Sequence, residues 1–164
     1  MRFTLIDRII ELQPDVSITA VKSLSLAEDY LKDHFPRFPV MPGVLMLETL
    51  VQTSAWLVRK SEDFAHGIVL LKEARNVKYA GFVEPGQVLT VTAEIEQHNE
   101  QTTRLKTRGT VDGMPAVSAR LILERFNASE RYPERSETEA YTRRKMRKLF
   151  DILYEPSNSQ ETYF

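Results

Sequence analysis

Two side chains between residues 33 and 52 have the chemistry to exchange a proton with a substrate, His34 and Glu48. A histidine titrates near neutrality, which suits it to proton transfer. Glu48 lies in an otherwise apolar run, and an ionised carboxylate in an apolar interior loses several kcal/mol of solvation unless it is paired. The two groups would form an acid and base pair if they lined the same apolar pocket.

Gly43 and Gln52 extend this candidate site. Gly43 opens a helix expected over residues 43–61, where unpaired backbone N–H groups favour negative charge and the missing side chain admits a substrate. These groups suit removal of a proton next to a carbonyl, with the enolate-like oxygen held at Gly43. Gln52 shares a helix face with Glu48. Two structural readings therefore stay open: Glu48 bonds only to Gln52 or nearby backbone, or it lies at a subunit contact.

Other candidates for site chemistry are weaker. His66 and His98 lie beside turn residues, and we expect both to be exposed loop residues. The chain has no cysteine, no short histidine spacing and no HExxH or Asp-rich loop, so we predict no metal and no cofactor. The G-x-S-x-G motif of serine hydrolases and a phosphate-binding glycine loop are also missing.

The segments around the site must position it. Three short elements, a helix, a strand and a turn of helix, are expected over residues 1–12, 17–26 and 28–32. Residues 33–42 contain three prolines and form a stiff loop that leads from His34 into the helix. The helix over residues 43–61 is apolar on nearly every side, so it must be buried.

The middle of the chain alternates apolar and polar residues, which is typical of strands. The expected strands cover residues 68–79 with an internal break, 87–97, 103–111 and 117–124, with a hairpin turn at Asp112 and Gly113. Several antiparallel strands after one buried helix predict an α+β fold in which a curved sheet wraps the helix.

Residues 127–164 form a separate extension in this interpretation, after a domain over residues 1–126. The extension begins with a polar linker over residues 127–139. An amphipathic helix over residues 139–156 follows, with a basic cluster, residues 143–148, on its solvated face. We expect this helix to pack on its own dimer or to shield the mouth of a pocket.

Length and composition limit the function. With 164 residues, 27% charged residues and a net charge of -1, the chain is a globular protein without the field of a nucleic-acid binder. No apolar run reaches the roughly 20 residues of a membrane span. Residues 1–12 lack the apolar core of a secretory signal, so we expect a cytoplasmic protein.

The run HFPRFPVMPGVLMLETLVQ, from His34 to Gln52, resembles the hallmark of the FabZ-type 3-hydroxyacyl-[acyl-carrier-protein] dehydratases, roughly GHFPGxPVMPGVLxxEAxxQ. A fainter similarity extends over residues 5–125. The resemblance implies the hotdog fold, a long helix wrapped by an antiparallel sheet. It also implies homodimers, or trimers of dimers, whose active sites combine residues from two subunits.

Residue by residue, the resemblance places the catalytic histidine at His34, the catalytic acid at Glu48, the carbonyl-binding N–H at Gly43 and a supporting glutamine at Gln52. The implied reaction is the dehydration of a (3R)-3-hydroxyacyl thioester, carried on the phosphopantetheine of acyl carrier protein, to the trans-2-enoyl product. The pathway is fatty acid biosynthesis or a related lipid route. The acyl chain would lie in a tunnel beside the central helix.

The sequence departs from the family pattern at four positions. Asp33 and Arg37 replace glycines on either side of the HFP motif, where they restrict the loop or pair across it. Phe82 and Gln87 differ in the later segment FVEPGQ, near the expected acyl entrance. Two other functions stay open, a hotdog acyl thioesterase in which Glu48 activates water, and a non-catalytic hotdog module that binds acyl carrier protein.

Overall fold

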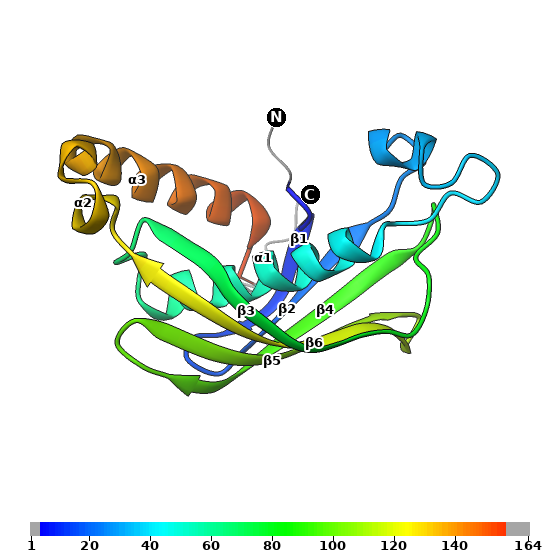
Figure 1. Ribbon diagram of the computed structural model, residues 1–164, viewed down its shortest axis with the longest axis horizontal. Coiled ribbons are helices and arrows are strands. Elements are labelled where there is room, and N and C mark those ends of the chain that lie inside the picture. Colours follow the sequence, from blue (N-terminus) through cyan, green and yellow to red (C-terminus); the bar gives the residue numbers. More distant parts are fainter. Residues whose placement is uncertain (1–3, 157–164) are drawn as a thin grey trace, which may run out of the picture.

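A six-stranded antiparallel sheet, with strand order β1-β2-β4-β5-β6-β3, curves around the long helix α1 (Gly43–Ser61) in the computed structural model, which describes residues 4–156 (Figure 1). The strands are β1 (Arg8–Gln13), β2 (Ser17–Ser23), β3 (Ile68–Tyr79), β4 (Val88–His98), β5 (Thr102–Val111) and β6 (Met114–Phe126). The predicted α+β architecture, a buried helix wrapped by a curved sheet, is confirmed.

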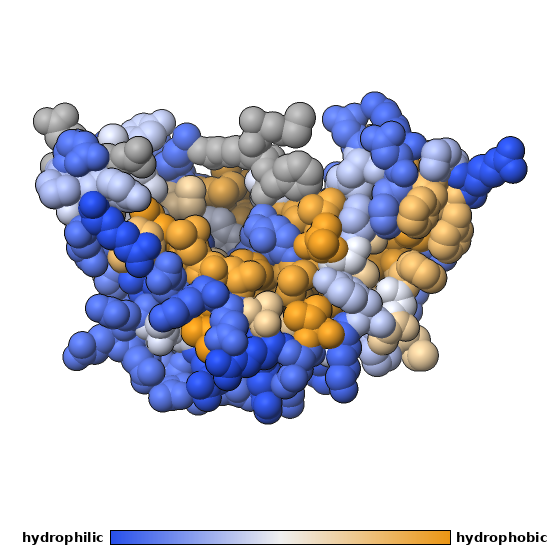
Figure 2. Space-filling model, viewed as in Figure 1, coloured by the Kyte–Doolittle hydropathy of each residue, from blue (hydrophilic) through white to orange (hydrophobic). Residues whose placement is uncertain are grey.

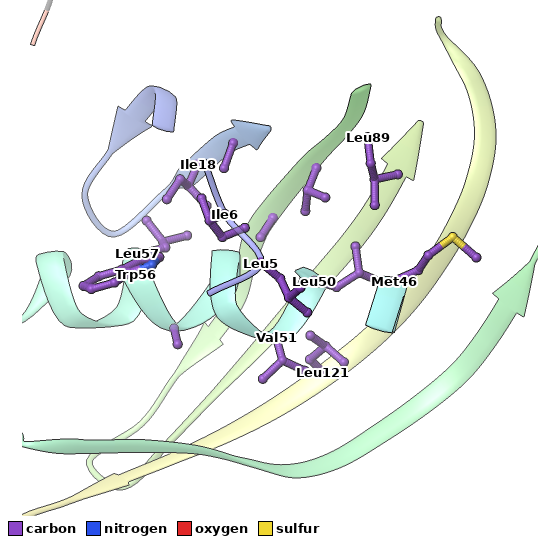
Figure 3. Close-up of a cluster of buried hydrophobic side chains, with 14 of the residues drawn as sticks. Leu5, Ile6, Ile18, Met46, Leu50, Val51, Trp56, Leu57, Leu89 and Leu121 are labelled. Atoms are coloured by element: carbon purple, nitrogen blue, oxygen red, sulfur yellow. The ribbon is translucent and has the colours of Figure 1, made fainter. Parts of the chain in front are cut away.

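The core forms where α1 meets the concave face of the sheet. Leu50 and Leu57 of α1 are fully buried and belong to the same hydrophobic cluster as Leu89 of β4 and Leu121 of β6 (Figure 3). Burial of each such leucine contributes about 1.5–3 kcal/mol. Three polar residues of α1 are also buried, but each hydroxyl donates to the carbonyl four residues earlier, at 2.8–2.9 Å; they are Thr49, Thr53 and Ser54.

The helix predicted over residues 1–12 is wrong, because this segment forms the edge strand β1. Ile9 pairs with Ala20 of β2, and the register then shifts by one residue before Glu11. A bulge of this kind interrupts the inward and outward alternation, so Ile9 and Leu12 both face the core although they are three residues apart. Apolar residues three positions apart are also typical of an amphipathic helix, so the sequence pattern predicted a helix here.

Strand β3 forms the other edge of the sheet and is continuous where a break was predicted. Two register shifts against β6, after Leu71 and after Arg75, account for the irregular sequence pattern. Three large hydrophobic side chains of this edge strand are substantially exposed, at 48%, 38% and 50%; they are Leu70, Leu71 and Tyr79. An unpaired sheet edge with exposed apolar side chains can pair with another chain.

The extension is helical from its start, with helical turns inside the polar linker predicted over residues 127–139. It contains the short helix α2 (Ala128–Arg131), a 3-10 turn (Pro133–Arg135) and α3 (Ser136–Leu153). The backbone N–H of Asn127 donates to the carboxylate of Glu130 at 2.9 Å, which caps α2. Among the described residues, no helix is long and apolar enough to cross a membrane.

Helix α3 packs on α1 through one aromatic residue. Phe150 is buried, and its ring centroid lies 6.0 Å from that of Trp56 and 5.5 Å from that of Phe64. Arg147 adds an ion pair with Asp63 at 2.9 Å. The helix therefore covers the C-terminal half of α1, at the end of the molecule opposite the loop of residues 33–42 (Figure 1).

Candidate active site

Glu48 is held by a short chain of hydrogen bonds. The backbone N–H of Leu5 donates to Oε1 of Gln52 at 2.9 Å, which fixes the orientation of the glutamine amide. The amide nitrogen of Gln52 then donates to Oε1 of Glu48 at 3.0 Å. The structural reading in which Glu48 bonds to Gln52 therefore describes a real contact, and this contact leaves Oε2 of the carboxylate for another partner.

Glu48 and Gln52 lie in the wall of a pocket of about 580 Å³ between α1, β3 and α3. Hydrophobic residues gather across this face of the molecule in Figure 2. The pocket is lined by Thr4, Glu48, Val51, Gln52, Ala55, Trp56, Arg59, Val69, Leu70, Leu71, Met146 and Leu149. A mostly apolar pocket with a few polar groups is the usual form of a small-molecule site.

His34 is half-buried in the proline-containing loop, where two carbonyl contacts fix it. Its Nδ1 lies 3.0 Å from the carbonyl oxygen of Val40, so the proton resides on Nδ1 and Nε2 is left as an acceptor. The backbone N–H of Val40 donates back to the carbonyl of His34 at 3.0 Å. The loop is anchored further by Met41, whose N–H donates to Val83 at 2.9 Å.

Gly43 begins α1, whose first turn has no acidic residue and no side-chain cap. The ring of Tyr79, from the end of β3, lies against its Cα: a β-carbon built at position 43 would be 3.0 Å from Cε1 of Tyr79. This close approach explains a glycine here. The N–H groups of Gly43 and Val44 form no hydrogen bond among the described residues, so they remain available to an electronegative atom.

Within one chain the predicted residues form two groups. Glu48 and Gln52 share the pocket, while His34 and Gly43 lie at the N-terminal end of α1. In the described part of the chain, His34 does not line the Glu48 pocket, and no hydrogen bond joins the two side chains. The described contacts of one chain therefore do not bring His34 and Glu48 together, and a site that uses both residues needs a further contact.

The prediction that His66 and His98 are exposed loop residues is wrong in part: His66 lies in a loop but is half-buried, and His98 is exposed but is the last residue of β4. Both contact one cluster of side chains around Glu62. Nδ1 of His66 lies 2.8 Å from Glu62, and Nε2 of His98 lies 3.3 Å from the same carboxylate. Arg125, whose side chain is only 2% exposed, pairs with Glu62 at the centre of the cluster. Among the side chains that the structure describes, no group of histidine and acidic residues is arranged to hold a metal ion.

The departures from the family pattern are accommodated locally. Asp33 and Arg37 form no ion pair with each other among the described residues, so the predicted pairing across the loop does not occur. The ring of Phe82 contacts that of Phe38 edge to face, with centroids 5.6 Å apart. Gln87 accepts the N–H of Glu84 at 2.8 Å and stabilises the turn before β4.

Arg59 is a pocket residue that the sequence interpretation missed. It is eleven residues after Glu48, and positions 48, 52 and 59 fall on one face of a helix. That spacing was the available signal. Burial lowers the pKa of Arg59 to about 10, and its Nε is buried without a hydrogen-bond partner.

Comparison with known protein families and sequences identifies relatives over most of the chain. The family described as FabA-like domain matches residues 1–120. The 3-hydroxyacyl-[acyl-carrier-protein] dehydratase FabZ of Ruminiclostridium cellulolyticum is 36% identical over 119 residues, which cover 73% of this chain and 84% of the relative. The FabZ of Wolbachia pipientis wMel is 40% identical over 94 residues, which cover 57% of this chain and 66% of the relative.

Solved structures share the fold at low identity. A dehydratase heterocomplex, ApeI:P from Xenorhabdus doucetiae, has a TM-score of 0.64 at 19% identity, covering 81% of this chain and 90% of that chain. A mutant thioesterase from Pseudomonas aeruginosa has a TM-score of 0.59 at 18% identity, covering 73% and 80%. Both likenesses support the hotdog fold, which is the α+β architecture described above. The family match ends at residue 120, before α3.

Proposed function

Because the chain belongs to the FabA-like dehydratase family, we propose that it removes water from a (3R)-3-hydroxyacyl thioester carried by acyl carrier protein. The product is the trans-2-enoyl thioester, in fatty acid or related lipid biosynthesis. The observation that carries this proposal is the carboxylate of Glu48, oriented by Gln52 in the wall of an apolar pocket.

In this mechanism the C2–H bond breaks and its proton passes to Nε2 of His34, the nitrogen that the Val40 contact leaves as an acceptor. The electron pair forms the C2–C3 double bond as the C3–O bond breaks. The carboxylate of Glu48 accepts a hydrogen bond from the C3 hydroxyl and orients it, and the proton that His34 took from C2 passes to this oxygen, which leaves as water and restores Nε2 as an acceptor. The N–H of Gly43 stabilises negative charge on the thioester oxygen.

We infer that two copies of the chain complete one site. His34 and Glu48 do not meet among the described contacts of one chain, and the sheet edge at β3 presents exposed Leu70 and Leu71 beside the Glu48 pocket. Pairing of two β3 edges would extend the sheet and cover this apolar face. His34 and Gly43 of one copy would then lie beside Glu48 and Gln52 of the other.

The test is to supply the purified chain with 3-hydroxyacyl and saturated acyl thioesters of acyl carrier protein, recording enoyl absorbance and free thiol together. The dehydratase proposal expects enoyl product without thiol release. Release of thiol without enoyl product would instead identify a thioesterase in which Glu48 activates water. A non-catalytic module would bind acyl carrier protein without turning over either thioester, and His34→Ala and Glu48→Gln would then change nothing.

A further inference from the structure

The pocket beside α1 has a polar group at each end. Glu48 and Gln52 mark one end, and Arg59 lies eleven residues further along the same helix face, about 16 Å away at 1.5 Å per residue. The wall between them is apolar and includes Ala55 and Trp56. A ligand with a long apolar middle therefore meets a cation at its far end.

Arg59 has no partner of its own. In the described part of the chain its guanidinium makes no hydrogen bond or ion pair, and its Nε is buried and unpartnered. Its one described contact is with the ring of Trp56, whose centroid lies 5.3 Å from Cζ. The group remains charged at neutral pH although burial lowers its pKa to about 10. A partly buried cation without an acceptor is costly, and an anion from a ligand would offset that cost.

Helix α3 closes this end of the pocket. Met146 and Leu149 line it opposite α1, and the aromatic packing of Phe150 on Trp56 holds α3 in place. This wall lies outside the family match, which ends at residue 120. The cation and the wall that surrounds it thus form a built subsite away from the residues proposed to react.

We propose that the pocket accepts acyl chains that end in a carboxylate, and that Arg59 selects for this end group. Placement of the thioester at the Glu48 end of the pocket rests on the proposed dehydratase function. Recognition of the carboxylate at the Arg59 end does not depend on turnover. Arginine suits this role because its planar guanidinium binds a carboxylate through two parallel hydrogen bonds.

The experiment uses N-acetylcysteamine thioethers, which neither dehydration nor thioester hydrolysis can consume. One series ends in a methyl group and the other in a carboxylate, with chain length increased stepwise. Trp56 is the only tryptophan of the chain, so its fluorescence reports occupancy directly. The parent should bind the best carboxylate probe at least about tenfold more tightly than its methyl counterpart, the usual effect of a hydrogen-bonded charge.

Three variants distinguish the effect of the Arg59 side chain from the effect of any positive charge near the pocket. Arg59→Met should reverse the preference in favour of methyl probes, and Arg59→Lys should keep part of the preference for carboxylate. Lys60→Met removes the adjacent positive charge, which lies over Phe150 outside the pocket lining, and should behave like the parent. Unfolding midpoints of all variants show whether each remains folded.

Equal affinity of the parent for both series would overturn the proposal, as would a preference that persists in Arg59→Met or disappears in Lys60→Met. Tighter, Arg59-dependent binding of free 4′-phosphopantetheine would assign the cation to the carrier arm instead, and would also overturn it. If the parent forms no enoyl product in the activity assay but still binds carboxylate probes more tightly through Arg59, the dehydratase proposal is refuted and the end-group proposal stands.

Discussion

The side-chain nitrogen of Gln52 lies 3.0 Å from Oε1 of Glu48, one helical turn away. The bond fixes which carboxylate oxygen is available to a substrate. We expect Gln52→Leu to lower kcat about 10- to 100-fold with little change in KM, since a hydrogen bond to a charged group contributes about 1.5–3 kcal/mol. Steady-state kinetics of enoyl formation measure this. Gln97→Leu, at an exposed glutamine of β4, is the control, and an unchanged kcat in Gln52→Leu would show that Glu48 needs no positioning.

Subunit mixing tests whether one site uses residues of two chains. His34→Ala and Glu48→Gln should each be inactive, but a refolded equal mixture should recover about one quarter of the parent activity. The reason is statistical: half of the dimers combine both variants, and one of the two sites in each is intact. Mixing either variant with itself is the control. A mixture as inactive as its components contradicts a shared site.

The contact between Gly43 and Tyr79 predicts a loss of function without a comparable loss of stability. A methyl group in Gly43→Ala would lie 3.0 Å from the tyrosine ring, which is half exposed and can move. The unfolding free energy should change by less than about 1 kcal/mol, because the higher helix propensity of alanine offsets the displacement of an exposed ring. Enoyl formation should fall because the methyl group obstructs the backbone N–H.

A double variant separates the two causes of that loss. Gly43→Ala with Tyr79→Ser removes the ring that the methyl group displaces. Activity should stay low if obstruction of the N–H is the cause. Recovery to the level of Tyr79→Ser alone would place the effect in the tyrosine.

Arg59 predicts a stability effect that depends on pH. Burial lowers its pKa to about 10, below the ordinary value of 12.5, so the folded state binds its proton less tightly than the unfolded state. The parent therefore gains stability as pH rises above about 10. At pH 7 the charge is present in both states, and Arg59→Met should be more stable by about 1 kcal/mol. Urea unfolding from pH 7 to 10.5 should show this advantage shrinking; a constant or growing advantage would contradict it.

Arg125 predicts a large cost for breaking a buried ion pair. Its side chain is 2% exposed and pairs with Glu62, which also contacts two histidines. We expect Arg125→Met to lose about 3–5 kcal/mol, because it leaves the carboxylate without its main partner. Replacing both residues by methionine should recover much of this loss. Urea midpoints measure both effects, and additive losses would show that the two residues are not coupled.

The sequence was most informative where burial imposes a regular period. Helix α1 and strands β4 to β6 were predicted because their apolar residues repeat as a buried helix and a half-buried sheet require. Strand β1 was mistaken for a helix because a bulge places Ile9 and Leu12 on one face. The predicted site residues rested on the motif between His34 and Gln52.

Long-range contacts lay beyond what periodicity can predict. Arg59 has the sequence context of an ordinary basic residue in the last turn of a helix, which complements the helix dipole. The packing of β3 and α3 encloses it, and nothing in the local pattern of residues 136–153 specifies which face of α1 they cover. Met146 and Leu149 became pocket residues for the same reason.

Helix α3 gives the molecule a modular organisation. The groups proposed to react lie between residues 34 and 52, whereas one wall of the pocket comes from a segment attached after the last strand. Exchange of residues 136–153 among related chains would therefore reshape the cavity while the reacting groups keep their own supports. Natural variation or engineering of this segment gives the scaffold a route to new ligands without altering its chemistry.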